Sequence, residues 1–586
     1  MRQWMVAAKK ADFYAIAEKF HVDPVVARII RNREVIGEKN IRIYLGGNLS
    51  DLSDPHQMKD MDRLVEILAQ KIRKQVHIRI IGDYDVDGVT SSHLFLTALR
   101  RVGAKVDVVI PHRIQDGYGL SLHLLQQAKE DGVDTILTCD NGIAAIDEIA
   151  WAKAQKMTVL VTDHHAVPFE EHEGRRTEKK SLADAVVNPH QQDCGYPYKE
   201  LCGAGVAWNV IRVLYENYDM DKREAEDLLD FVAMATVCDV MSLTGENRIL
   251  VKEGLKRIRH TKNIGLQALM QACNVQPENI SAYHFGYVLG PCVNATGRLD
   301  TARHALRLFE TGQETEAEEI ARDLVDLNQE RKELTLQGVE MAKKLCEEGG
   351  YENDPVLVLF LPDVHESIAG LIAGRIREMY NRPVFVLTRG EEGVKGSGRS
   401  TENYSMYENM CGCAELFTKF GGHPMAAGLS LPEENVEKFR RKINENCLLT
   451  VEEVCPDIHI DMAMPVGYAS TELVHQFALL EPFGKDNPSP LFADRNLSIS
   501  RMWVIGKNRN VLRMSVLSEY GQPVPVIFFG DVETLFAYFT EKFGQEEVEN
   551  ALHGRKNRIL FSMVYTAKID FYQGNENLQL EMKYYR

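Results

Sequence analysis

The segment Ile80–Gly88, which reads IIGDYDVDG, predicts the architecture of the region around it. Three carboxylates, Asp83, Asp85 and Asp87, occupy alternate positions directly after an apolar, strand-like run. Side chains at alternate positions of an extended chain point the same way, so we expect these carboxylates to converge on one point. Like charges that close do not all stay ionised unless a cation holds them. A turn rich in Asp and Gly would explain the segment equally well if it stood alone.

The same order, an apolar run followed by a carboxylate, recurs three times along the chain. The runs are Thr135–Cys139 before Asp140, Val159–Thr162 before Asp163-His164-His165, and Phe231–Cys238 before Asp239. Because helix-like stretches lie between these short strands, the pattern predicts a parallel sheet. Ligands of such sheets bind at the carboxyl ends of the strands, so we expect four acidic strand ends at one edge. Asp and His without Cys suit Mg²⁺ or Mn²⁺ better than structural zinc.

Together these motifs resemble the DHH phosphoesterase superfamily, whose name describes residues 163–165 here. Residues 83–88 match its first motif, residues 140–142 its second and Asp239 its fourth. Further stretches resemble RecJ, a family of single-strand-specific exonucleases of bacteria, and the resemblance spans roughly residues 40 to 580. These stretches are residues 111–119, 290–299, 396–400, 421–428 and 480–492.

The resemblance implies an α/β fold: a DHH parallel-sheet domain and a DHHA1 α/β domain joined by a long helix, plus a C-terminal OB-type β-barrel. Apolar residues at helical spacing between residues 320 and 334 also predict the long helix. Short strands between residues 497 and 564 fit a small barrel. The expected parts are a helical arm (1–74), the DHH domain (75–300), the connecting helix (301–348), the DHHA1 domain (349–454) and the OB domain (455–586).

The resemblance also implies two divalent ions, Mn²⁺ or Mg²⁺, and assigns their ligands. One ion would be held by Asp83, Asp85 and Asp140, and the other by Asp87, Asp140, His164 and Asp239, with Asp140 bridging. The catalytic residues would be Asp140, His164 and His165, of which His165 contacts the scissile phosphate or protonates the leaving oxygen. The substrate-binding residues would be Arg113, Tyr118, Asn294, Arg298, Ser397, Arg399 and His423.

The residues on the substrate side have a physical rationale of their own. Gly396–Ser400, which reads GSGRS, offers backbone N–H groups, a hydroxyl and a guanidinium to a phosphate, although a glycine hairpin with an exposed Arg is the alternative. The sequence departs from the family pattern in three places. Ile81 stands where many DHH enzymes carry a metal-binding His, and Cys292 stands where the family usually has Arg. Val364 and Ser367 flank His365 where RecJ often shows Trp and Gly. We therefore expect one phosphate contact of the family to be weakened.

Composition sets further bounds. The length of 586 residues suits three or four domains, and 45% hydrophobic with 26% charged residues is ordinary for a globular protein. The N-terminus starts no signal peptide and no apolar run approaches the ~20 residues that span a bilayer, so we expect a cytoplasmic protein without membrane contact. Eleven scattered cysteines fit reduced core residues, and Cys411 with Cys413 is the one close pair.

The net charge of −17 argues against binding of long duplexes, because binding to nucleic acid is usually driven by a basic surface. A metal site must be acidic, however, and bound cations reverse its local sign. Basic residues gather at 507–513 and at 555–558, where a solvated face is the alternative to a binding surface.

The activity implied by the resemblance is that of a metal-dependent phosphodiesterase. It would digest single-stranded DNA from 5′ to 3′, release 5′-mononucleotides and act in DNA repair and recombination. One alternative is a single-strand-binding scaffold of the same fold with reduced catalysis, which has no reason to keep the metal ligands. A second is a DHH nuclease for RNA or short oligonucleotides; the C-terminal barrel argues for a longer polymer, and the sequence leaves open whether that polymer is DNA or RNA. The implied partners are single-stranded DNA, a single-strand-binding protein and a RecQ-type helicase, with the chain itself a monomer.

Overall fold

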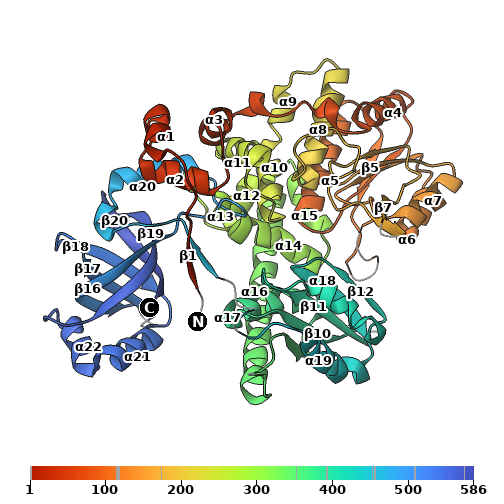
Figure 1. Ribbon diagram of the computed structural model, residues 1–586. Coiled ribbons are helices and arrows are strands. Elements are labelled where there is room, and N and C mark those ends of the chain that lie inside the picture. The colour runs from red at the N-terminus through yellow and green to blue at the C-terminus, as the bar shows by residue number, and fades with distance from the viewer. Residues whose placement is uncertain are drawn as a thin grey trace. The chain divides into compact units, whose positions relative to one another are not determined.

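The computed structural model describes residues 3–586 apart from a few short gaps, which are residues 114, 115, 117, 118, 173, 174, 352, 391, 392, 452, 454–456, 507–509 and 573. Two features singled out from the sequence, Tyr118 and the basic run 507–509, lie outside the described residues. The chain divides into two compact units whose elements are labelled in Figure 1. The first contains residues 52–241 and 249–456, and the second contains residues 3–51, 242–248 and 457–586. Within the described residues no helix is both long and apolar enough to cross a membrane.

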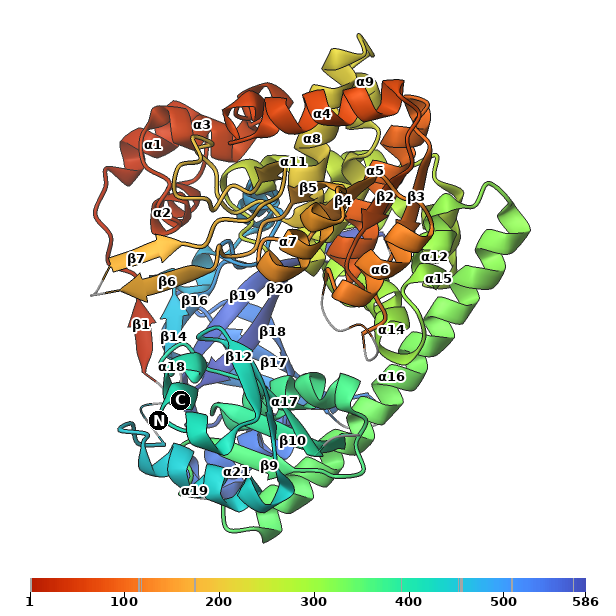
Figure 2. The ribbon, with the colours of Figure 1, turned by 90° about the vertical axis from the view of Figure 1, so that its right-hand side faces the viewer.

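The first unit begins with a sheet of five strands, all parallel, as the sequence predicted. The strand order is β3-β2-β4-β5-β8, and Figure 2 shows most of these strands side by side. Apolar side chains of α6 and α7 pack on one face, and α4, α5 and α8 pack on the other. The bounds are β2 Ile78–Ile81, β3 Val106–Val109, β4 Thr135–Cys139, β5 Thr158–Thr162, β8 Ala185–Val187, α4 Met61–Arg73, α5 Val86–Arg101, α6 Leu122–Glu130, α7 Ile146–Ala154 and α8 Gly203–Asn217.

The predicted strand at Phe231–Cys238 is wrong, because this run lies in the helix α10 (Leu229–Cys238). Nearly every side chain of α10 is buried, so the helix is apolar on all sides and lacks the polar stripe that marks a surface helix. A short apolar run of that kind cannot be told from a buried strand by its periodicity. Asp239 is therefore presented by the C-terminal cap of a helix and not by a strand end.

Helices connect this sheet to a second one. The expected helix 301–348 is divided, because α15 (Arg303–Glu310) ends before α16 (Glu314–Glu348) begins, and α16 packs along α12, α14 and α17. Figure 1 shows α16 as a long helix that reaches the second sheet. The remaining elements of this part are β6 Phe169–His172, β7 Arg175–Glu178, α9 Arg223–Glu226, α11 Gly245–Ile258, α12 Ile264–Ala272, α13 Ala282–His284 and α14 Gly290–Leu299, with a π-helical turn at Phe285–Leu289.

The second sheet has the order β12-β13-β11-β10-β9, in which only β9 and β10 are parallel. One face packs on α17 and α16, and the opposite face packs on α18 and α19. This alternation follows from the strands, in which successive side chains point to opposite faces. The bounds are β9 Leu357–Phe360, β10 Val384–Gly390, β11 Gly393–Arg399, β12 Lys419–Gly422, β13 Ala426–Leu431, α17 Glu366–Tyr380, α18 Met406–Cys411 and α19 Val436–Glu445.

The second unit is a small β-barrel, closed by pairing of β16 with β19. Its apolar core includes side chains from α1, α2 and α3, so residues 3–51 belong to this unit and do not form the separate arm expected over 1–74. The bounds are β1 Trp4–Val6, α1 Phe13–Phe20, α2 Pro24–Asn32, α3 Glu38–Gly46, β14 Ile458–Ile460, β15 Met462–Ala463, α20 Thr471–Phe477, β16 Phe492–Ile505, β17 Val511–Leu517, β18 Pro523–Phe529, α21 Val532–Phe543, α22 Gln545–Leu552, β19 Leu560–Tyr572 and β20 Asn575–Tyr585.

The first testable prediction concerns the close approach of α8 to the end of β4. A Cβ at Gly203 would lie 2.6 Å from the Cβ of Asp140, whereas a Cβ at Gly205 would make an ordinary 3.4 Å contact with Leu201. We expect Gly203→Ala to lower the free energy of unfolding by about 1–3 kcal/mol through overpacking. Gly205→Ala is the matched control, which helix propensity should leave neutral or stabilise by up to about 1 kcal/mol. Urea unfolding compares the two, and equal midpoints would contradict the close approach.

Candidate active site

The first carboxylate after β2, Asp83, is fully buried. Neither of its oxygens has a hydrogen-bond partner among the described residues. Burial and the neighbouring charge of Asp85 raise the pKa of Asp83 well above its usual value. A buried carboxylate without a donor is costly unless a cation compensates its charge. The position of Asp83 therefore indicates a cation site.

The next two carboxylates of this loop are turned in different directions by backbone N–H groups. Asp85 caps α5, because its Oδ1 accepts a hydrogen bond from the Gly88 amide at 3.0 Å. Asp87 lies in the first turn of α5 and accepts hydrogen bonds from the amides of Gly203 (2.6 Å) and Ala204 (2.8 Å) at the start of α8. The expectation that three carboxylates converge on one point is wrong, since the chain turns from strand to helix between them.

The acidic and imidazole side chains instead form three overlapping groups, each with its ligand atoms within 4.8 Å of one another. Nε2 of His164 lies 3.0 Å from an oxygen of Asp140, 3.7 Å from one of Asp87 and 3.6 Å from one of Asp239. Asp140 and His164 each belong to two groups, so they join the whole arrangement. The groups are Asp83 with Asp85 and Asp140, Asp87 with His164 and Asp239, and Asp140 with His164 and His165.

Asp140 is held at this junction by the backbone at the end of β4. Its φ of 62° is left-handed, a conformation that Asp and Asn adopt more readily than most residues. The side-chain amide of the next residue, Asn141, donates to the carbonyls of Ile81 (3.0 Å) and Cys139 (2.9 Å), which fixes the ends of β2 and β4 together. Burial and the charges of Asp87 and Asp85 raise the pKa of Asp140 well above its usual value.

The two histidines are oriented by Asp163, a motif residue to which the sequence assigned no role of its own. Asp163 accepts hydrogen bonds from the amides of Ile143, His164 and His165 and lies 2.8 Å from Nδ1 of His165. Burial opposes protonation of His165, but Asp163 outweighs it and raises the pKa of His165 to about 9. Burial lowers the pKa of His164, which keeps that ring neutral. The pair therefore has one protonated and one metal-competent imidazole.

This donor set fits two divalent cations. It offers carboxylate oxygens and one neutral imidazole, the ligands that suit Mg²⁺ and Mn²⁺, and no thiolate belongs to the three groups. The unpartnered oxygens of Asp83 and the three carboxylates around His164 mark the two positions. Asp140 lies between them and can contribute to both.

Beside these carboxylates, arginines gather without acidic partners among the described residues. Burial and the neighbouring guanidinium of Arg113 lower the pKa of Arg298 to about 10. Burial and Arg113 also lower the pKa of Arg399. Arg113 lies over the ring of Tyr84, with 4.8 Å from its Cζ to the ring centroid. Buried cations that repel one another are stabilised by an anion with several oxygens, such as a phosphate.

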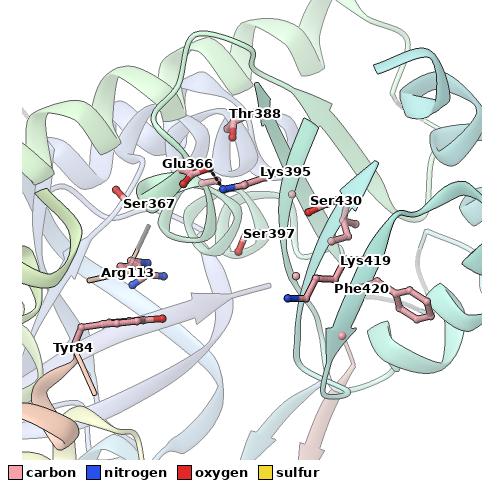
Figure 3. A pocket seen from close by; sticks show the side chains of 15 residues that line it. Tyr84, Arg113, Glu366, Ser367, Thr388, Lys395, Ser397, Lys419, Phe420 and Ser430 are labelled. Carbon is pink, nitrogen blue, oxygen red and sulfur yellow. Dashed lines mark ion pairs between the residues drawn. The ribbon is translucent and has the colours of Figure 1, made fainter. Parts of the chain in front are cut away.

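Two cavities open onto this arginine cluster. One, of about 420 Å³, is lined by Tyr84, Arg113 and Ser397, and Figure 3 shows Ser397 on β11 facing the space beside Arg113. The other, of about 460 Å³, is lined by Arg113, Arg298 and His365. The structure thus brings together four of the seven predicted substrate-binding residues, Arg113, Arg298, Ser397 and Arg399, with Arg399 coupled electrostatically to Arg113.

The remaining predicted residues lie elsewhere. Asn294 accepts a hydrogen bond from the Val86 amide at 3.1 Å, so its side chain supports the carboxylate loop. His423 is exposed in the turn between β12 and β13 and is not among the lining residues of either cavity. Tyr118 is outside the described residues. Tyr84, which lay inside the first motif without an assigned role, lines a cavity instead.

The structure also shows where Cys292 and Ile81 lie, two residues that depart from the family pattern. Cys292 is buried, with its sulfur 3.8 Å from that of Cys273 and 3.4 Å from Nδ2 of Asn328, and it lines neither cavity. The expectation that Cys292 weakens a contact with phosphate stays a prediction. Ile81 is part of the apolar core under α6 and α7.

Fold and site together define a class of protein. A parallel sheet with acidic and imidazole ligands at its carboxyl edge, followed by a second α/β sheet that adds cations, is the arrangement of a DHH phosphoesterase. Three family models match in chain order. They are the DHH family, N-terminal domain, at residues 77–236; the DHHA1 domain at residues 353–448; and the RecJ OB domain at residues 460–584.

Individual relatives narrow the class. The single-stranded-DNA-specific exonuclease RecJ of Haemophilus influenzae is 32% identical over 96% of this chain and 96% of its own length. The protein of that name from Bacillus subtilis is 33% identical over 87% of this chain, which spans 63% of the Bacillus protein. The crystal structure of RecJ from Thermus thermophilus in complex with Mn²⁺ matches the whole chain with a TM-score of 0.81, 25% identity and 79% of that structure covered. The chain belongs to the RecJ family, and the predicted fold class is confirmed.

The second prediction concerns pH and metal. The folded protein raises the pKa of Asp83, Asp85 and Asp140, so it binds more protons there than the unfolded chain does. Stability from these groups is present at low pH and is lost as pH rises through the folded pKa values. Because cations offset the same repulsion, the increase in Tm on adding Mn²⁺ to EDTA-treated protein should be larger at pH 8 than at pH 5.5.

A matched pair of variants isolates the bridging carboxylate in the same measurement. Asp140→Asn keeps the left-handed backbone and removes one buried charge, so it should raise the Tm of the metal-free protein and abolish most of the Mn²⁺ response. Asp147→Asn, on the exposed face of α7, should change neither. A Mn²⁺ response that survives in Asp140→Asn, or one that is larger at low pH, would contradict the bridge.

Proposed function

We propose that this chain is a metal-dependent exonuclease that digests single-stranded DNA from the 5′ end and releases 5′-mononucleotides. The observation that carries the proposal is the junction at Asp140, where two groups of metal-type ligands meet beside an arginine cluster without acidic partners among the described residues. Single-stranded DNA is proposed as the substrate because the named relatives are single-stranded-DNA-specific exonucleases. Two cations in these positions would supply the Lewis acid that stabilises charge on a phosphodiester during hydrolysis.

The chain's own residues have separate tasks in this proposal. Arg113, Ser397 and Arg399 bind the 5′-phosphate and thereby place the first phosphodiester at the carboxylates. His165 is protonated near neutral pH because of Asp163, so it can contact the scissile phosphate and donate a proton to the leaving 3′ oxygen. His164 stays neutral and acts as a ligand.

Single-strand specificity follows from the size of the substrate cavity. A space of about 420 Å³ is in the range of small-ligand pockets, which suits one nucleotide-sized group. Glycines at positions 421 and 428 line the cavity and have no side chains that would fill it. The ring of Tyr84 offers a face on which a base can stack. A duplex end would have to unpair before its terminal nucleotide entered.

The barrel is proposed to hold the following part of the strand. Trp503 is partly exposed (37%) on β16 and lies in a groove with Arg513, and the guanidinium of Arg501 lies 5.7 Å from its ring centroid. Aromatic faces beside basic side chains are the usual means by which such barrels bind single strands. A longer polymer is therefore favoured over short oligonucleotides as the substrate.

The second candidate is a binding scaffold with reduced catalysis. Such a scaffold would be expected to lose metal ligands, whereas every proposed ligand belongs to one of the three groups and Asp163 accepts hydrogen bonds from three backbone amides beside the histidines, which supports an enzyme. The enzyme is therefore the better proposal. We further propose a role in DNA repair and recombination in the cytoplasm, as a monomer beside a single-strand-binding protein and a RecQ-type helicase. Free cysteines throughout the described residues suit a reducing compartment.

The third prediction tests polarity and the phosphate contact. With Mn²⁺ or Mg²⁺, strands labelled at the 5′ end should release labelled mononucleotide before strands labelled at the 3′ end. Arg399→Ala should raise KM for a 5′-phosphorylated strand by about 10-fold or more, the value of one charge-assisted contact, and narrow its advantage over a 5′-hydroxyl strand. Arg389→Ala, an exposed arginine paired with Glu433, is the control. An unchanged preference, or digestion from the 3′ end, would refute the assignment.

The fourth prediction concerns the barrel. Deleting residues 455–586 would expose the apolar faces of α1–α3, so a point variant is the cleaner test. Trp503→Ala should weaken binding to a long single strand by about 1–3 kcal/mol, the value of one stacked base, while cleavage of a dinucleotide stays unchanged. Binding measured over a salt series should show a steep slope for both proteins. Equal losses on the long strand and the dinucleotide would mean that Trp503 is structural.

A further inference from the structure

The sheet face that carries Ser397 and Arg399 continues beyond them. Lys395 is two residues before Ser397 on β11, so it lies on the same face, at a spacing of about 6.7 Å along the strand. The register places Thr388 of β10 and Ser430 of β13 opposite Lys395, and Lys419 of β12 opposite Ser430. These four side chains form a row across the sheet that we call the lysine row: Thr388, Lys395, Ser430 and Lys419.

The neighbouring row leaves room for a ligand. Ser397 lies opposite Gly428, which lies opposite Gly421. A Cβ at Gly421 would meet nothing within 4 Å, so the sheet surface between Ser397 and Lys419 is open. The cavity that contains Tyr84 and Arg113 extends over this surface, and all four residues of the lysine row line it.

The cavity extends from the proposed 5′-phosphate position away from the carboxylate loop. In Figure 3, Tyr84 and Arg113 lie on one side of Ser397, and Lys419 lies on the other with its ammonium group turned toward the cavity. Tyr84 belongs to the carboxylate loop, so the lysine row is on the far side of the 5′-phosphate position from that loop. A strand that ends in a 5′-monophosphate has no atoms beyond this position, and the lysine row would then have no ligand.

The charges of the row favour an anion. Lys419 has no acidic partner among the described residues, and Lys395 is paired with Glu366 at 2.8 Å. The hydroxyl of Thr388 is buried without a hydrogen-bond partner among those residues. Hydroxyls and ammonium groups at this spacing suit successive phosphoryl oxygens, to which lysines bind as point charges.

We propose that the lysine row binds the additional phosphoryl groups of a strand whose 5′ end is a di- or triphosphate. The proposal rests on the proposed function, because it takes Arg113, Ser397 and Arg399 as the site of the first phosphate. Hydrolysis of the first phosphodiester then adds the hydroxyl of water to phosphorus and a proton to the 3′ oxygen. The first product is a nucleoside 5′-di- or triphosphate, and the shortened strand keeps a 5′-monophosphate.

Glu366 sets the strength of this site. Its carboxylate neutralises Lys395 and repels an incoming phosphate, so the ligand must displace Lys395 from the ion pair. Removing the charge of Glu366 should therefore strengthen anion binding, while removing Lys419 should weaken it. Opposite effects from two residues of one cavity are not expected from a general loss of structure.

Binding of inorganic anions tests the site without any nuclease activity. In EDTA, calorimetric titration should show tripolyphosphate binding more tightly than orthophosphate. Lys419→Ala should weaken tripolyphosphate binding about fivefold, and Glu366→Gln should strengthen it by a similar factor. Lys438→Ala removes the same charge from α19 on the opposite face of the sheet and should change nothing. Equal affinity for both anions, or equal effects of Lys419→Ala and Lys438→Ala, would overturn the proposal.

Cleavage then tests the ligand class. A 5′-triphosphorylated strand should yield nucleoside triphosphate as the first product, and Lys419→Ala should raise KM for this strand more than for the 5′-monophosphate strand. Release of dinucleotides from the monophosphate strand would overturn the proposal, because the lysine row would then hold the first phosphate. If no strand is cut while tripolyphosphate binding behaves as expected, the proposed nuclease function fails and the anion site stands.

Discussion

The mutual repulsion of buried carboxylates is the constraint on which the rest of this structure depends. Asp83, Asp85, Asp87 and Asp140 lie in a region from which water is largely excluded, and burial with the neighbouring charges raises the pKa of Asp83, Asp85 and Asp140. Such a cluster is unstable by itself in a low-dielectric interior. Everything around it, from the amides at the start of α8 to the left-handed turn at Asp140, keeps the groups in place for cations that remove the repulsion.

The surrounding backbone provides fixed partial charges for this purpose. The N-terminal amides of α8 bind Asp87, and the amides after β5 bind Asp163, so two carboxylates are oriented by donors that need no side chain. Helix N-termini favour negative charge because their first N–H groups lack intrahelical partners. The negative charge of Asp163 in turn raises the pKa of His165. Backbone amide donors therefore orient the carboxylates and, through Asp163, also favour the proton on His165.

On the proposed substrate side, the like charges that lie close together are positive. Arg113, Arg298 and Arg399 are held together by the fold although they repel one another, and burial lowers the pKa of the last two. Acidic groups that would compensate them are placed on the metal side instead. In the proposed function, the negative oxygens of a phosphodiester would be attracted both by the arginines and by cations at the carboxylates. On both sides, repulsion between like charges lowers the stability of the ligand-free protein, and a bound ligand of opposite charge would relieve it.

The sequence alone determined the parallel sheet, the second sheet, the barrel strands and the residue types of the site, because strand periodicity and motif spacing are local properties. It could not assign Phe231–Cys238, whose apolar residues look alike in a strand and a buried helix. Nor could the alternate spacing separate Asp85 from Asp87, which only the family resemblance assigned to different ions, since the direction of Asp87 depends on α8, more than a hundred residues away. Tertiary packing alone decided these directions, the place of Cys292 in the core and the row from Thr388 to Lys419. Contacts between distant segments set all of them, and no local pattern records such contacts.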